Sequence, residues 1–172
     1  MTQREPSFQE AMEIAAGWMK QWDLDEISDE VMADRVGALV ASRDGARGFF
    51  VVSLAGDSAL MDRLPDALVI KLREAGDAVV DLTARNLAMS AAMAVHHRNN
   101  NDDEQAAGSE RVNQRCSELL RQLDSHRVKD RLEVLLEAAH HSRGEDLAFL
   151  ERWGYDDHQK RAIGDAVQAV AE

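Results

Sequence analysis

The fold is decided by residues 112–139, VNQRCSELLRQLDSHRVKDRLEVLLEAA, which contain one apolar spacing twice. The spacing is i, i+4, i+7, i+8, i+11, which follows the 3.6-residue period of an α-helix. It is occupied first by Val112, Cys116, Leu119, Leu120 and Leu123, and then by Val128, Leu132, Leu135, Leu136 and Ala139. The pattern predicts two consecutive amphipathic helices whose apolar faces pack in a bundle.

Helical signals of the same kind extend outward toward both ends of the chain. Ser7 followed by Glu10 has the spacing of a capping box, which begins a helix. Pro65 fits the first turn of a helix, and Gly76 fits its end. Helices are expected over Ser7–Trp22, from Ser28 to Asp44-Gly45, over Pro65–Ala75, from Asp77 to about Arg98, over Glu145–Trp153 and over Asp156–Val170.

Residues 48–56, GFFVVSLAG, are the one stretch where a β-strand competes with a helix. Its aromatic and β-branched residues favour a strand. A lone strand in a helical chain would have no strand to pair with, so a buried helix is expected instead. Because no linker separates the helical segments, we predict an all-α fold. It is a single domain over residues 1–172, a bundle of six to eight amphipathic helices.

The composition is typical of a soluble protein of the reducing cytoplasm. The chain has 172 residues, one cysteine and a formal net charge of −12. The acidic balance opposes binding to nucleic acid. We expect no signal peptide and no membrane span, since no apolar run reaches the ~18–20 residues that a span needs. Residues 1–34 hold nine acidic and two basic residues, which is −7 of the total charge. This region either steers a basic partner or is a solvated, solubilising surface.

Two histidine pairs are the main candidates for chemistry. His96-His97 and His140-His141 both fall where a predicted helix ends, and cationic side chains are favoured there by the helix dipole. The alternative is a metal site. Glu137 and His140 have the Glu-x-x-His spacing of di-iron bundles, and His96 and His97 could complete a ligand set. A di-iron centre needs a second such pair, which the chain lacks, so only a mononuclear site stays open.

Polar residues also occur on the alanine-rich helix. Asn86, Ser90 and His97 lie at i, i+4, i+11 and must find hydrogen-bond partners if they are buried. They form either a network between helices that fixes their register or the lining of a polar pocket. Cys116 occupies an apolar position, so a buried, inert thiol is expected.

Three stretches carry a family resemblance: NLAMSAAMAVHHRNN at Asn86–Asn100, GSERV at Gly108–Val112 and FLERWGY at Phe149–Tyr155. In these stretches the chain resembles an uncharacterised family of short cyanobacterial proteins. The resemblance covers most of the chain and implies a cytoplasmic, cyanobacterial protein. It implies no activity and no functional residues.

The absence of a complete catalytic constellation leads to a functional expectation. We expect a non-enzymatic protein that acts in assembly or regulation by binding another protein, which includes a second copy of itself. No cofactor is expected. One alternative is a small metal-dependent enzyme that uses the histidine pairs. The other is a ligand- or pigment-binding bundle that uses Trp18, Trp22 and Phe49-Phe50.

Overall fold

The computed structural model describes residues 4–171, and within them the fold is all-α, with no strand. Nine α-helices are present, eight of them at least seven residues long, which confirms the predicted helical bundle. They are α1 (Phe8–Asp23), α2 (Asp29–Leu39), α3 (Arg43–Ala55), α4 (Asp66–Glu74), α5 (Asp77–Asn99), α6 (Asp103–Gln122), α7 (Ser125–His141), α8 (Leu147–Arg152) and α9 (Asp157–Ala171). A short 3₁₀ helix, η1 (Leu60–Asp62), precedes α4.

The ambiguous residues 48–56 are helical up to Ala55, as predicted, and belong to α3. Phe49 and Phe50 are fully buried and meet edge to face, with ring centroids 5.1 Å apart. The helix before them ends at Leu39, short of the predicted limit at Asp44-Gly45. It ends early because the Ser42 hydroxyl accepts a hydrogen bond from the Gly45 amide at 3.0 Å and begins α3.

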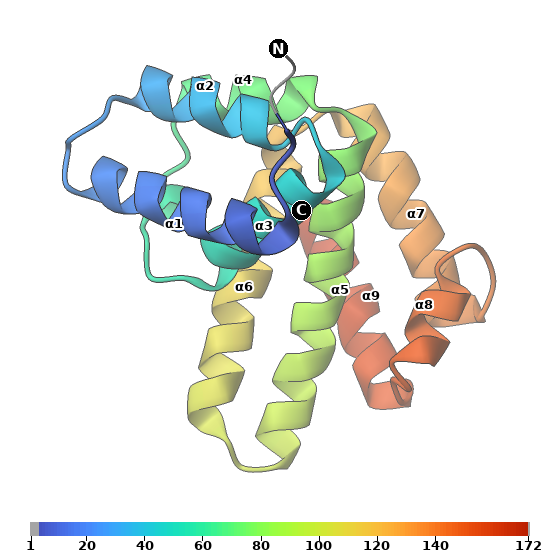
Figure 1. Cartoon of the computed structure of the whole chain (residues 1–172). Helices are drawn as coiled ribbons and strands as arrows, with labels where there is room; N and C mark the ends of the chain where they lie inside the picture. The colour runs from blue at the N-terminus through green and yellow to red at the C-terminus, as the bar shows by residue number, and fades with distance from the viewer. Residues whose placement is uncertain (1–3, 172) are drawn as a thin grey trace. The chain divides into compact units, whose positions relative to one another are not determined.

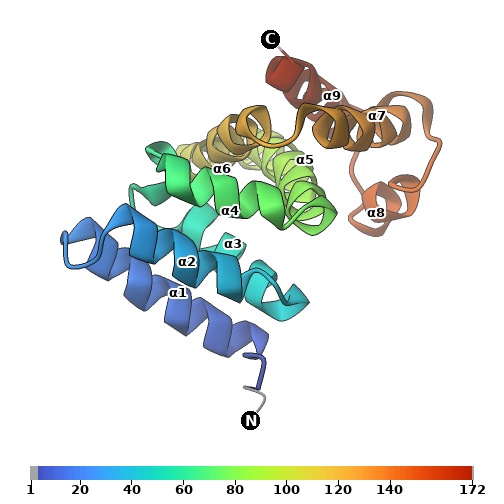
Figure 2. The same cartoon turned by 90° about the horizontal axis from the view of Figure 1, so that it is seen from above.

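The contacts divide the chain into two compact units, and the boundary lies between Leu82 and Thr83, inside α5. In the first unit α1 packs along α3, and α2 packs against both α1 and α4 (Figures 1 and 2). Gly48 lies at the crossing of α3 with α1, where the backbone of Phe8 and Met12 comes close. The prediction of one domain over residues 1–172 stays a prediction.

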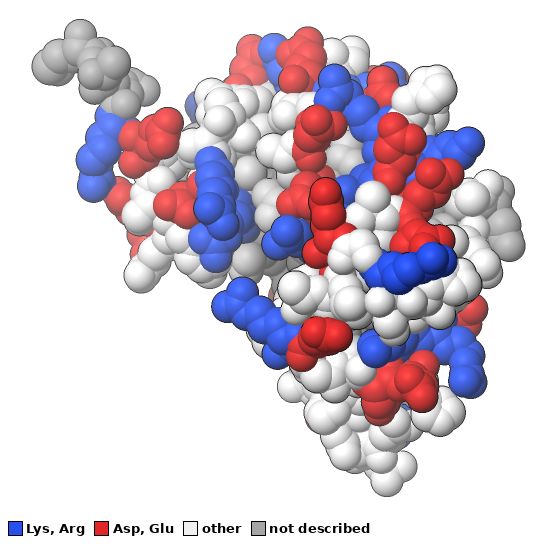
Figure 3. Space-filling model, turned by 90° about the vertical axis from the view of Figure 1, so that its right-hand side faces the viewer, with Lys and Arg blue, Asp and Glu red and all other residues white. Residues whose placement is uncertain are grey.

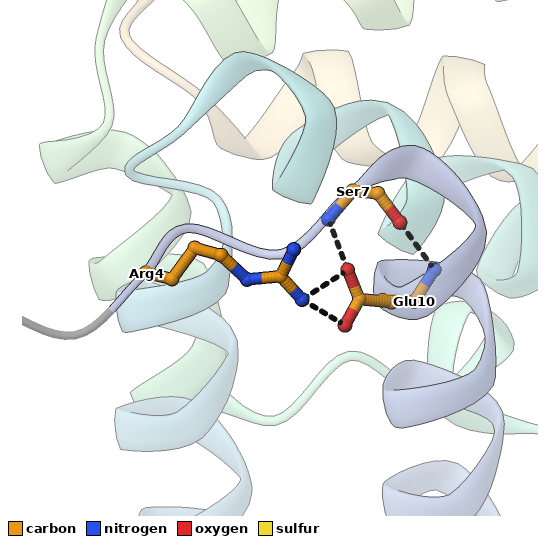
Figure 4. A network of polar contacts seen from close by, with 3 residues as sticks. All are labelled: Arg4, Ser7 and Glu10. Atoms are coloured by element: carbon orange, nitrogen blue, oxygen red, sulfur yellow. Dashed lines mark hydrogen bonds and ion pairs between the residues drawn. The ribbon is translucent and has the colours of Figure 1, made fainter.

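The predicted capping box begins α1 (Figure 4). The Ser7 hydroxyl accepts from the Glu10 amide at 3.1 Å, and the Ser7 amide donates to Glu10 Oε1 at 3.1 Å. Arg4 Nη2 lies 2.7 Å from Glu10 Oε2. These contacts lower the pKa of Glu10, first through the Ser7 backbone amide, then through the Ser7 hydroxyl and, more weakly, through the Arg4 charge.

The second unit holds most of α5 and all of α6–α9. In it α9 packs against α6 and α7, and α8 packs against α7 (Figure 2). A turn at Gly154 joins α8 to α9, and this glycine has the left-handed φ of 64° that suits a residue without a side chain.

Among the described residues one helix, α5, is long and apolar enough by length and composition to cross a membrane. Asp81 and Arg85 interrupt it, which is why the sequence shows no uninterrupted apolar run of that length. Of its most apolar window, 56% is buried within the protein, as in the core helix of a soluble protein.

Candidate functional site

Both histidine pairs lie in the last turn of a helix, as predicted. His96 and His97 end α5, and His140 and His141 end α7. Within each pair the rings meet edge to face, with centroids 5.4 Å and 6.2 Å apart.

Apart from the ring contact between His96 and His97, the candidate metal ligands contact groups outside the predicted ligand set. His96 Nε2 lies 3.2 Å from Asn100 Nδ2, and Glu137 Oε2 lies 3.2 Å from Arg143 Nη2. Across residues 4–171, no three side chains of His, Cys, Asp or Glu gather as metal ligands would. The structure therefore does not bring His96, His97, Glu137 and His140 together as one ligand set.

His140 packs against another helix. Its ring lies over Gly164 of α9 and occupies the space that a side chain at that position would need. This contact lets α7 and α9 approach closely at their crossing. This contact could not be predicted, because an isolated glycine in α9 does not reveal which residue it faces.

Two roles were predicted for Ser90 of α5: a hydrogen-bond network between helices or the lining of a polar pocket. Ser90 is buried, and its hydroxyl donates to the Leu87 carbonyl at 3.0 Å. Asn113 of α6 donates from Nδ2 to that same carbonyl at 3.1 Å and to Ser90 Oγ at 3.2 Å. Ser90 thus belongs to a hydrogen-bond network between two helices. Asn113 was not predicted as a member of this network, although it directly follows Val112, the first residue of the α6 apolar stripe.

The other two members of that predicted set lie differently. His97 has no hydrogen bond to Ser90 or Asn113 in the part of the chain that the structure describes, and its carbonyl accepts from the Asp102 amide at 2.8 Å. Asn86, one turn before Ser90 on α5, has a half-buried side chain that makes polar contacts of its own. The three residues are therefore not one pocket lining.

Cys116 is completely buried in α6, as the sequence predicted. Burial raises the pKa of its thiol far above the ordinary value, so the thiolate that a nucleophile requires does not form near neutral pH.

The aromatic residues proposed for pigment binding are used in packing. Phe49 and Phe50 are core residues of the first unit. Trp22 Nε1 donates to Asp29 Oδ1 at 2.8 Å, and the Arg35 guanidinium lies 5.9 Å from the centre of the Trp18 ring. Trp22 lines a hollow whose other residues are mostly polar or acidic, among them Asp23, Asp25 and Glu26.

An apolar groove of about 490 Å³ lies in the second unit, between the end of α6, α7 and the end of α9. Its lining is mainly aliphatic and includes Leu120, Leu123, Val128, Leu132, Leu136 and Val167. At one end Arg121 donates from Nη2 to the Ala169 carbonyl at 2.6 Å and so caps the last turn of α9. Lys129 and Glu133 of α7 also line the groove.

The groove was not predicted as a site, although most of its residues belong to the two apolar stripes that decide the fold. Each stripe was assigned to the core. No local signal marked the groove, because adjacent apolar residues of one helix can both be buried, as Leu119 and Leu120 of α6 are. Leu135 is fully buried, whereas Leu136 is half-buried and faces the groove.

Charged side chains form no broad basic field on the face shown in Figure 3, where acidic and basic residues are interspersed.

A comparison of the chain with models of known protein families finds one matching family. Its model, described as "Uncharacterised conserved protein UCP020893", matches residues 7–170, which is nearly the whole chain. No curated protein and no solved structure matches the chain. The chain therefore belongs to the family of uncharacterised conserved protein UCP020893.

Proposed function

We propose that this protein acts in assembly or regulation by binding a protein partner, without catalysing a reaction. The observation that carries the proposal is the apolar groove between α6, α7 and α9. Aliphatic side chains that line an open groove are a typical docking surface for the apolar face of an amphipathic helix. The proposed occupant is such a helix from a protein partner.

The chemistry of the remaining polar groups supports this reading. Ser90 and Asn113 hold two helices together, Glu137 pairs with Arg143, and the Cys116 thiol is buried. These groups are engaged in structural contacts and do not converge on one point where a substrate could react. We include in the proposal a cytoplasmic location and the cyanobacterial origin that the family resemblance implies.

Site-specific photocrosslinking in cells tests the proposal. A photoreactive amino acid at position 136, on the groove, is expected to give discrete protein adducts. The same amino acid at position 51, an exposed valine of α3, is the control and is expected to give none. Ala171→Lys, introduced into the position-136 protein, places a charge at an exposed position of the groove lining and should abolish the adducts while circular dichroism shows an unchanged helix content.

The outcomes are distinct. Adducts at position 136 that disappear with Ala171→Lys support the proposal. No adducts at position 136, or equal adducts at positions 51 and 136, would overturn it. Mass spectrometry of the adducts then separates a second copy of this chain from a different protein.

A further inference from the structure

We infer that the helix bound in the groove is α7 of a second copy of this chain, in an antiparallel dimer with two-fold symmetry. The inference rests on the proposed function, since it names the occupant of the same groove. It is drawn from the charges that accompany the aliphatic lining.

Lys129 and Glu133 lie one helical turn apart on the groove side of α7. In a two-fold interface each contact occurs twice. When residue i of the first copy meets residue j of the second, residue j of the first copy also meets residue i of the second. When two α7 helices lie antiparallel with the axis near Arg131, Lys129 of each copy faces Glu133 of the other. A pair of opposite charges on one helix is thus complementary to itself.

The same register suits the apolar residues. It brings the half-buried Leu136 of each copy toward the Ser125 end of the other copy's groove. Leu120 and Leu123 line that end and supply the aliphatic surface that a leucine side chain would contact. The Lys129–Glu133 pairs and the Leu136 contacts are therefore made in the same antiparallel arrangement of the two α7 helices.

The stability of the single chain does not explain the positions of these charges. Within residues 4–171 neither Lys129 nor Glu133 makes an ion pair. Lysine placed four residues before glutamate is the weaker order for a pair within a helix. An intermolecular role accounts for both features.

Charge reversal combined with sedimentation velocity tests the dimer on the full-length protein. The unaltered protein should sediment as a dimer. Lys129→Glu creates two like-charge contacts per dimer, as does Glu133→Lys, and each should weaken dimerisation by at least about tenfold. Lys20→Glu reverses a charge on α1, outside the groove, and is the matched control that should leave the dimer intact.

Two further samples test whether Lys129 of one copy faces Glu133 of the other in the dimer. An equimolar mixture of the Lys129→Glu and Glu133→Lys proteins should form a heterodimer, since every contact then joins opposite charges. The double variant K129E/E133K should again dimerise with itself. A monomeric unaltered protein, or single variants that dimerise normally, would overturn the inference, as would a mixture that stays monomeric.

Failure here differs from failure of the proposed function. A monomer that still gives crosslinks to another protein at position 136 would overturn the dimer and leave the groove as a docking site. A monomer without crosslinks would overturn both.

Discussion

Gly48 lies where α3 crosses α1, and the approach of the two helices depends on its missing side chain. A Cβ atom at this position would lie 2.5 Å from Ala11 Cβ, 2.9 Å from the Met12 amide nitrogen and 2.9 Å from the Phe8 carbonyl oxygen. Two of these three atoms belong to the backbone of α1, so they cannot move aside as a flexible side chain would. We predict that Gly48→Ala lowers the free energy of unfolding by about 1–3 kcal/mol, as overpacking does. Urea denaturation followed by circular dichroism measures this change.

Gly17 supplies the matched control for that prediction. It lies inside α1, and a Cβ there would have no neighbour within 4 Å. Gly17→Ala is therefore expected to stabilise the protein by about 0.5–1 kcal/mol, because alanine favours a helix more than glycine does. If Gly48→Ala stabilised the protein as Gly17→Ala does, helix propensity would explain both changes and the close crossing at Gly48 would be refuted.

Single residues were predictable where a local pattern specifies their role. The Ser7–Glu10 capping box and the burial of Cys116 follow from spacing alone, and both are confirmed. The bond from Asn113 to Ser90 spans 23 residues of sequence, and no local pattern names such a partner. The contact of His140 with Gly164 was missed for the same reason.

Between elements, the connection from α7 to α8 depends on a buried ion pair. Arg131 Nη1 donates to Asp146 Oδ2 at 2.5 Å and Nη2 donates to Oδ1 at 3.0 Å, with only 16% and 5% of the two side chains exposed. Asp146 falls at the start of the helix that the sequence predicts over Glu145–Trp153, where an acidic residue is favoured. Asp146 does precede α8, but its side chain makes no cap and binds Arg131 instead.

We predict that Asp146→Ala lowers the free energy of unfolding by about 3–5 kcal/mol, because it leaves the Arg131 charge buried without its carboxylate. Glu137→Ala removes the partner of Arg143 from an exposed pair, with 49% and 70% of the side chains exposed, and is the control. Its expected cost is about 0–1 kcal/mol. Thermal and urea unfolding of the two variants give the comparison, and equal losses would show that the pair from α7 to Asp146 is not buried in solution.

At the same scale, the helices themselves could be predicted, because an apolar stripe is a local property of each segment. The two stripes of residues 112–139 became α6 and α7. The groove could not be predicted, since it is formed by three helices and depends on how far apart α7 and α9 lie. The sequence specified which residues are apolar but not which of them the neighbouring helices leave uncovered.

For the whole molecule, the open question is whether the two compact units unfold together. Their boundary lies between Leu82 and Thr83, in the interior of the continuous helix α5. Separating the units at that boundary would break consecutive hydrogen bonds of one helix, whereas domain boundaries usually fall in exposed linkers. The single-domain prediction therefore requires one cooperative unfolding transition.

Tryptophan fluorescence can follow each unit separately, because Trp18 and Trp22 lie in the first unit and Trp153 lies in the second. One variant, W18F/W22F, keeps only the reporter of the second unit, and the other, Trp153→Phe, keeps only those of the first. For a single domain, the fluorescence midpoint of each variant should coincide with its own midpoint by circular dichroism, which reports helices of both units. Adding Gly48→Ala to W18F/W22F should then lower the Trp153 midpoint, although the substitution is in the other unit. A Trp153 midpoint that does not respond to Gly48→Ala would mean that α5 joins two domains that unfold independently.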